Sequence, residues 1–296
     1  MKTKTATIYH SLGCVACAGA LLISSSNAQA QTLFEADFYT GEINEFTPGG
    51  TESTFASGFA HPLGLTFDNE GDLFVADNLR GSITEITPGG TRSTFATGLS
   101  YANGLAVNSA GDVFEADAGT GNVYEFTPSG TRTTFASGLF EPSALAFNNA
   151  GNLFVVSGVD ILTFTPSGVQ SVVALDGAFP AGLAFDSSGD LFESDSAGSI
   201  NEFTPSGTQS AFVTGLNDIL PGLAVNNADD VFVDENSGNI IEITPGGTQS
   251  TFASGLDLPI GLAFQVVPEP PVSGWLAGSA AALLVCHHRK PRSSNA

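Results

Sequence analysis

Basic side chains are almost absent from the middle of this 296-residue chain. Residues 31–267 contain no lysine and only three arginines, Arg80, Arg92 and Arg132, against 29 acidic residues, a formal charge of −26. Neutralising nucleic-acid phosphates requires clustered lysine and arginine. The composition therefore excludes nucleic acid as a partner and favours a divalent cation or a cationic surface ligand.

The middle region also lacks cysteine, because Cys14, Cys17 and Cys286 all lie in the end segments. It must fold without disulfides and depend on core burial, with bound cations as one further source of stability. It has a single histidine, His61, and no serine in a Gly-x-Ser-x-Gly turn. Cysteine-based and serine-based hydrolysis are therefore poorly supported.

The first thirty residues are typical of a secretory signal peptide. Lys2 and Lys4 precede an apolar run at residues 11–24, and Ala28-Gln29-Ala30 places small residues where a signal peptidase cleaves. We expect cleavage after Ala30 and export through the inner membrane.

The last thirty residues have three parts. Pro268, Glu269 and Pro270 precede an apolar stretch at 272–286, and Arg289, Lys290 and Arg292 follow it. This order resembles the PEP-CTERM sorting signal, which implies processing by an exosortase-type membrane protease and delivery to the cell surface or extracellular matrix. The fifteen apolar residues fall short of the about 20 that a full span needs, so the resemblance implies a hydrophobic helix that anchors the chain only transiently. An ordinary C-terminal membrane anchor is the alternative.

Between these ends, one unit of about 40 residues is repeated six times. The phrase Leu33–Asp37 returns at Leu73, Val113, Leu153, Leu191 and Val231. Each unit holds four short β-rich runs separated by turn residues such as Pro88-Gly89-Gly90, and none of the region shows helical periodicity. The pattern predicts an all-β fold, a six-bladed β-propeller of four-stranded blades covering residues 31–267.

The two ends of the repeat array are complementary. The first unit begins at its second strand, and a lone first strand, predicted at 261–266, ends the array. We expect this C-terminal strand to complete the first blade and close the ring, which leaves no free sheet edge.

The repeated phrase Gly-Leu-Ala-Phe, followed by Gly-Asp-Leu-Phe-Val-Ala-Asp, resembles NHL repeats and gluconolactonase-like propellers. The resemblance covers residues 31–267 and implies a fold shared by lactonases, lyases and binding scaffolds. Asn103 matches the asparagine that holds the catalytic metal in gluconolactonases. Ala181 stands where the family has an aspartate ligand, and the glutamate ligand has no convincing counterpart.

An acidic residue ends the second strand of five blades, and Ser157 takes this place in the fourth. These side chains are expected at the channel mouth, where with Asn103 they form a candidate metal or ligand site for Ca²⁺. The alternative is that each carboxylate accepts backbone N–H bonds of the next turn. The five acids are Asp37, Asp77, Asp117, Asp195 and Glu235.

Two residues earlier, Glu35, Glu115 and Glu193 alternate with valines around the ring. Each shares a strand face with its neighbouring acid, and only three arginines are available to pair with them. We expect these glutamates to face solvent, share protons or bind a cation. Duplication of an 80-residue double blade would give the same alternation without any function.

The leading interpretation is an exported, non-enzymatic propeller with a binding or structural role. The alternative is a metal-dependent lactonase, other hydrolase or lyase of the gluconolactonase type, acting at the channel mouth near Asn103. The fourth repeat is two residues shorter than most others and deviates over residues 156–161. A specialised site is therefore expected between blades three and five.

Overall fold

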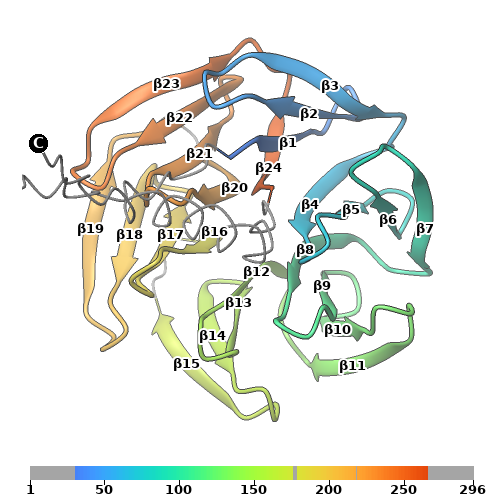
Figure 1. Ribbon diagram of the computed structural model, residues 1–296. Helices are drawn as coiled ribbons and strands as arrows, with labels where there is room; N and C mark the ends of the chain where they lie inside the picture. Colours follow the sequence, from blue (N-terminus) through green and yellow to red (C-terminus); the bar gives the residue numbers. More distant parts are fainter. Residues whose placement is uncertain (1–30, 176–178, 218, 266–296) are drawn as a thin grey trace, which may run out of the picture.

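The computed structural model describes residues 31–175, 179–217 and 219–265 (Figure 1). Six four-stranded antiparallel sheets surround a central axis, which confirms the predicted six-bladed β-propeller. Blade 1 is the sheet β24-β1-β2-β3, and blades 2 to 6 follow in chain order as β4–β7, β8–β11, β12–β15, β16–β19 and β20–β23.

Each blade runs from an innermost strand at the axis to an outer strand at the rim. The innermost strands are β24 (Pro259–Phe264), β4 (Pro62–Phe67), β8 (Ala102–Val107), β12 (Pro142–Phe147), β16 (Pro180–Phe185) and β20 (Ile219–Val225). The second strands are β1 (Leu33–Asp37), β5 (Leu73–Asp77), β9 (Val113–Asp117), β13 (Leu153–Ser157), β17 (Leu191–Asp195) and β21 (Val231–Glu235). The third strands are β2 (Glu42–Phe46), β6 (Ser82–Ile86), β10 (Asn122–Phe126), β14 (Asp160–Phe164), β18 (Ser199–Phe203) and β22 (Asn239–Ile243). The outer strands are β3 (Glu52–Ser57), β7 (Arg92–Thr97), β11 (Arg132–Ser137), β15 (Gln170–Leu175), β19 (Gln209–Thr214) and β23 (Gln249–Ser254).

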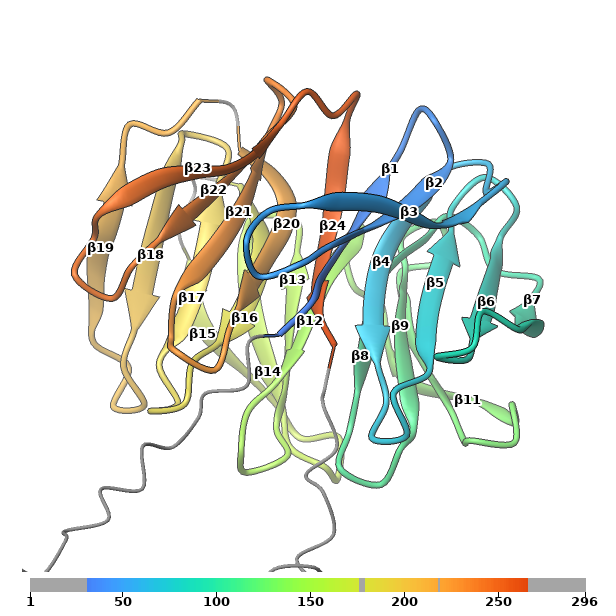
Figure 2. The same cartoon turned by 45° about the horizontal axis from the view of Figure 1, so that its top comes forward.

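The last described strand closes the ring, as the repeat array predicts. β24 lies antiparallel to β1 and pairs Leu33 with Phe264 and Ala36 with Gly261 (Figure 2). The strand begins at Pro259 and ends at Phe264, two residues earlier at each end than predicted. A β-bulge at Ile260 brings Pro259 opposite Asp37, and the pairing therefore extends to the N-terminal end of β24.

Several predicted features lie outside the described residues. These are the signal peptide with its cleavage site after Ala30 and the sorting segment 268–296, including Pro268, Glu269, Pro270, the apolar stretch 272–286, Arg289, Lys290 and Arg292. They stay predictions. Within the described residues, no helix is both long and apolar enough to cross a membrane.

The second strands set the packing between blades, because their side chains alternate between two blade interfaces. In blade 1, Leu33 packs with Phe232 of blade 6, whereas Phe34 packs with Phe67 of blade 2. The first, third and fifth residues of a second strand therefore face the preceding blade. The second and fourth residues face the following blade.

Aromatic side chains fill the interfaces between blades. Phe34 makes edge-to-face contacts with Phe55 and Phe67, each with ring centroids 5.0 Å apart. The same arrangement recurs at the other interfaces, with valine replacing one aromatic ring in three of them. Between blades 4 and 5, Val173 takes the place of an aromatic ring, and a cavity of about 220 Å³ lies beside it. The repeated phenylalanines thus belong to the core.

Candidate functional site

The acids that end the second strands are buried at the channel mouth, where they hold the loops that join the blades. The first strand of each blade starts beside the end of its second strand, as the pairing of Pro62 with Asp77 shows. Asp37 accepts N–H bonds from Tyr39 and Thr40 in its own turn and from Asp257 in the loop entering the blade. Asp117 and Glu235 likewise accept bonds from their own turn and the incoming loop, and Asp195 accepts N–H bonds from its own turn.

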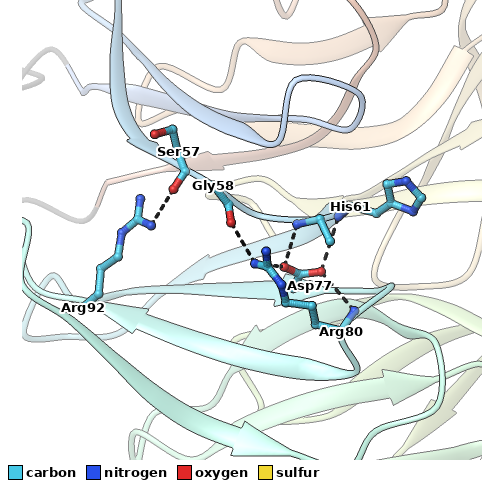
Figure 3. A network of polar contacts seen from close by, with 7 residues as sticks. Ser57, Gly58, His61, Asp77, Arg80 and Arg92 are labelled. Atoms are coloured by element: carbon cyan, nitrogen blue, oxygen red, sulfur yellow. Dashed lines mark hydrogen bonds and ion pairs between the residues drawn. The ribbon is translucent and has the colours of Figure 1, made fainter.

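Asp77 shows this arrangement most fully (Figure 3). Its carboxylate accepts the backbone N–H groups of Ala60, His61 and Arg80 and forms an ion pair with the Arg80 guanidinium at 3.0 Å. The His61 imidazole points away from this carboxylate and stacks on Phe38, with ring centroids 4.1 Å apart. Described side chains of His, Cys, Asp and Glu nowhere converge in threes where they could hold a metal ion.

Asn103 lies at the central channel. Together with Leu63, Ser143, Pro221 and Ile260, the residues at the same blade position, it lines a cavity of about 150 Å³. The innermost strands approach closely here, because a Cβ on Gly104 would collide with the carbonyl oxygen of Ser143. Asn103 is thus held by backbone packing at the point where the gluconolactonase-like resemblance implies a metal ligand.

The alternating glutamates are fully buried, which excludes the solvent-facing alternative. Glu35, Glu115 and Glu193 each have 0% exposure and lie on the strand face toward the preceding blade. The Asn44 amide donates to Glu35 at 3.0 Å, and the Asn201 amide donates to Glu193 at 2.9 Å. The three glutamates occupy three separate interfaces and do not meet.

Burial raises the pKa of two of these glutamates. The pKa of Glu35 rises to about 8, mainly because its carboxylate is desolvated, although the bond from Asn44 opposes the shift. The pKa of Glu115 rises to about 9 through desolvation and through repulsion by Asp117, partly offset by the backbone amide of Asn103. Both groups therefore favour the protonated form near neutral pH.

A pocket at the channel mouth lies between blades 3 and 5, beside the irregular fourth repeat. Its volume is about 830 Å³, within the range of small-molecule sites. In blades 1 to 3 the turn between second and third strands has four residues, but in blade 4 Ser157 pairs with Asp160 across only two. Gly158 and Val159, the two residues of this shortened turn, line the pocket. The lining residues are Tyr101, Asn103, Ala118, Gly119, Phe140, Glu141, Ser143, Ser157, Gly158, Val159, Asp160, Phe179 and Pro180.

Exposed aromatic side chains surround this pocket. Tyr101, Phe140 and Phe179 are 62–69% exposed, whereas the repeated phenylalanines between the blades pack into the core. The backbone is strained at the rim, because Tyr101, Glu141 and Phe179 have φ angles of 62°, 42° and 56°. Bulky residues rarely adopt positive φ, and such strain is concentrated at ligand sites.

Blade 4 also fixes Phe140. Ser157, which replaces the usual acid, donates its hydroxyl to the Phe140 carbonyl and accepts the Phe140 N–H at 3.0 Å. The Phe140 ring lies against the backbone of Gly158, where a Cβ would be 2.8 Å from the ring. Phe140 is therefore held by Ser157, which replaces the acid that ends the second strand in the other blades.

Sequence reasoning singled out Asn103 and the fourth repeat but missed the aromatic rim. The missed signal is that Tyr101, Phe140 and Phe179 stand in loops beside a shortened turn. Sequence reasoning also missed Asp234, which is fully buried on β21. Its signal is an acid where the other blades have Ala36, Ala76, Ala116, Val156 and Ser194.

No protein-family model and no curated protein sequence matches this chain. Many solved structures share its fold. It is similar to a chain of a nidogen/laminin complex, with TM-score 0.73 and 18% identity over 80% of this chain and 98% of that one. Virginiamycin B lyase from Staphylococcus aureus matches with TM-score 0.58 and 16% identity, over 79% and 82% of the two chains. A gluconolactonase from Xanthomonas campestris matches with TM-score 0.62 and 14% identity, over 70% and 83%.

These likenesses show a fold that gluconolactonases and virginiamycin B lyase share with a chain of the nidogen/laminin complex. At identities of 14–18% they carry no chemistry across to this chain. The function must be argued from its own residues.

Proposed function

We propose that this protein is an exported binding propeller that holds a small ring-bearing molecule, neutral or positively charged, in the pocket between blades 3 and 5. The observation that carries the proposal is the gathering of exposed aromatic side chains around a pocket of about 830 Å³. Large exposed apolar groups that cluster on a soluble protein mark binding sites. The predicted N-terminal signal peptide and the predicted C-terminal sorting segment support a place of action outside the inner membrane.

The charge of the pocket selects the ligand class. Glu141 and Asp160 are the charged residues among its lining residues, and Asn103, Ser143 and Ser157 supply neutral polar groups. The three described arginines are engaged elsewhere, since Arg80 pairs with Asp77 while Arg92 and Arg132 stack on Phe59 and Tyr124. Aromatic faces attract rings and cations. An anionic ligand would find no positive group at this site.

A matched pair of probes tests this proposal. We expect tryptamine, an indole carrying an ammonium group, to bind at least about 10-fold more tightly than indole-3-acetate, which carries a carboxylate. Ligand-observed NMR titration gives both affinities. Phe140→Ala should weaken tryptamine binding by about 10-fold, because it removes one of the three exposed aromatic rings at the pocket.

Tyr39→Ser is the control for that variant, since Tyr39 is an exposed aromatic residue outside the lining set. It should leave tryptamine binding unchanged. Equal binding of the two probes, no binding of either, or equal losses in Phe140→Ala and Tyr39→Ser would contradict the proposal.

The position of Asn103 favours a second candidate, a metal-dependent lactone hydrolase. Asn103 lines both the central cavity and the pocket between blades 3 and 5, here called the aromatic pocket. A group bound at Asn103 would therefore reach either space. Sharing a fold with a gluconolactonase is compatible with this activity. Asn103 supplies one amide oxygen, which falls short of the three protein ligands typical of a catalytic zinc site.

The lactonase candidate is tested by measuring the hydrolysis of glucono-δ-lactone. The acid released is titrated in a pH-stat, with Ca²⁺, Mn²⁺ or Zn²⁺ present. A lactonase at this site should hydrolyse the lactone at least about 100-fold faster than buffer, and Asn103→Ala should remove most of the gain. Asn148→Ala, a turn residue of blade 4 away from the mouth pockets, is the control. A metal-dependent rate that Asn103→Ala leaves intact would exclude catalysis at Asn103.

A further inference from the structure

Buried oxygen atoms without hydrogen-bond partners are concentrated between blades 6 and 1. Asp234 is 0% exposed and neither of its carboxylate oxygens has a partner. Oε1 of Glu35, also 0% exposed, and Oδ1 of Asn44, 3% exposed, are likewise unpartnered. Four buried acceptors in this state are costly unless something else satisfies them.

The packing of the second strands brings these groups to one interface. Glu35 is the third residue of β1 and shares a face with Leu33, which packs on Phe232 of blade 6. Asp234 shares a face of β21 with Phe232 and therefore points toward blade 1. Asn44 is paired opposite Glu35 and donates to its Oε2 at 3.0 Å, which leaves the amide oxygen free.

Their electrostatics agree with this placement. The pKa of Asp234 is raised well above its ordinary value, first by burial and then by repulsion from Glu35. The pKa of Glu35 is also raised by burial and by the nearby Asp37, Glu52 and Glu42. The two carboxyl groups therefore lie within range of each other in a region that contains only negative charge.

Among the described residues, no lysine or arginine belongs to the two blades that form this interface. The arginines of the described residues are Arg80, Arg92 and Arg132 in blades 2 and 3, and blades 1 and 6 contain no lysine or arginine. Protonating both carboxyl groups would turn two of the four unpartnered oxygens into donors for the other two, so protons are the competing occupant of this site. A divalent cation would instead balance the charge of both carboxylates and be coordinated by their oxygens and the amide oxygen.

We propose that the interface between blades 6 and 1 binds one divalent cation of the calcium class through Asp234, Glu35 and Asn44. Carboxylate and amide oxygens are the ligands that Ca²⁺ takes. The carbonyl oxygen of Ile260 lies close by, since a Cβ on Gly222 would contact both that oxygen, at 3.0 Å, and the Asp234 carboxylate. Gly222 thus leaves the space that the Asp234 side chain occupies.

The site has a structural consequence. β24 and β1 are the C-terminal and N-terminal strands of the propeller, and their blade meets blade 6 at this interface. A cation held there would join the two ends of the repeat array to the rest of the ring in a domain without disulfides. This inference is independent of the aromatic pocket and of its ligand.

The test measures calcium binding and thermal unfolding of the full chain at pH 7.5 and matched ionic strength. After chelator treatment, isothermal titration with CaCl₂ should show one ion bound per chain. At a free calcium concentration about 100-fold above Kd, the unfolding temperature should rise by about 5–10 °C. Asp234→Ala and Glu35→Val should abolish both effects.

The other blades supply the replacements and the control. Ala36, Ala76 and Ala116 occupy the Asp234 position, and Val75, Val155 and Val233 occupy the Glu35 position, so both substitutions fit the fold. Glu115→Val removes an equally buried glutamate from another interface and should keep the full calcium response. Asp234→Asn, which retains the size of the side chain, should weaken binding at least about 10-fold.

Three results would overturn the proposal. The first is no stoichiometric calcium binding by the unaltered protein. The second is a calcium response of equal size in Asp234→Ala, which would assign the effect to screening of the acidic surface. The third is an unfolding temperature that changes with pH but not with calcium, which would mean that Glu35 and Asp234 hold protons instead.

Discussion

Glu115→Val should make the protein more stable, and the gain should increase as the pH rises from about 5 to about 9. Glu115 is 0% exposed, and burial raises its pKa to about 9 from an ordinary value of 4.5. The nearby Asp117 raises it further, whereas Arg132 and the Asn103 amide act in the opposite direction. The variant removes a carboxyl group that is costly to ionise in the folded protein.

The sign follows from proton linkage. Between pH 4.5 and about 9 the folded protein keeps the Glu115 proton while the unfolded chain has lost it. The free energy of unfolding therefore falls by about 1.4 kcal/mol per pH unit across this window. The loss is complete above the folded pKa, where it amounts to several kcal/mol. Valine has no such dependence, and Val75, Val155 and Val233 show that this position accepts it.

Urea unfolding at pH 5, 7 and 9 in the presence of chelator measures this effect. The difference in unfolding free energy between variant and unaltered protein should grow by about 1.4 kcal/mol per pH unit, the slope expected for a single proton. Glu70→Gln, which removes an exposed glutamate from a turn of blade 2, is the control and should leave the slope unchanged. Parallel curves for Glu115→Val and the unaltered protein would show that Glu115 is ionised at neutral pH.

The fold could be predicted because six copies of the repeat specify the same four-stranded unit. Six copies of one strand phrase, and an array that begins at a second strand and ends at a first strand, permit few closed arrangements. The predicted ends of β24 were wrong by two residues, because the bulge at Ile260 is a local adjustment that no repeat specifies.

The candidate sites were harder to predict, because they depend on departures from the repeat. Whether Tyr101 and Phe179 are buried is set by the conformation of their loops, in which both residues have a positive φ angle. Hydrophobicity alone places such residues in a core. The Asp234–Glu35 pair joins residues about 200 positions apart, and only the closed ring makes them neighbours. The acid at the alanine position was visible in the sequence, but its partner was not.

The phenylalanines between blades should carry the largest share of the core energy. Phe34→Ala should lower the free energy of unfolding by about 3–5 kcal/mol, because it removes a buried ring and leaves a cavity. Phe34 is 2% exposed and contacts both Phe55 and Phe67 edge to face at 5.0 Å. Such pairs add about 0.5–1.5 kcal/mol beyond the buried area.

Phe154→Ala is the matched comparison, and it should cost about half as much. Phe154 holds the same position in blade 4, but it is only partly buried and keeps one aromatic partner, Phe185, since Val173 replaces the other. The cavity of about 220 Å³ beside it means that some of its packing is already missing. Urea unfolding gives both losses, and equal losses would refute the view that aromatic pairing sets the strength of each interface. Val173→Phe should restore the missing partner, raising stability by about 1 kcal/mol and making Phe154→Ala as costly as Phe34→Ala. A single side chain then accounts for the weakness of the interface between blades 4 and 5, and these blades should be joined less firmly than blades whose interface keeps all three aromatic rings.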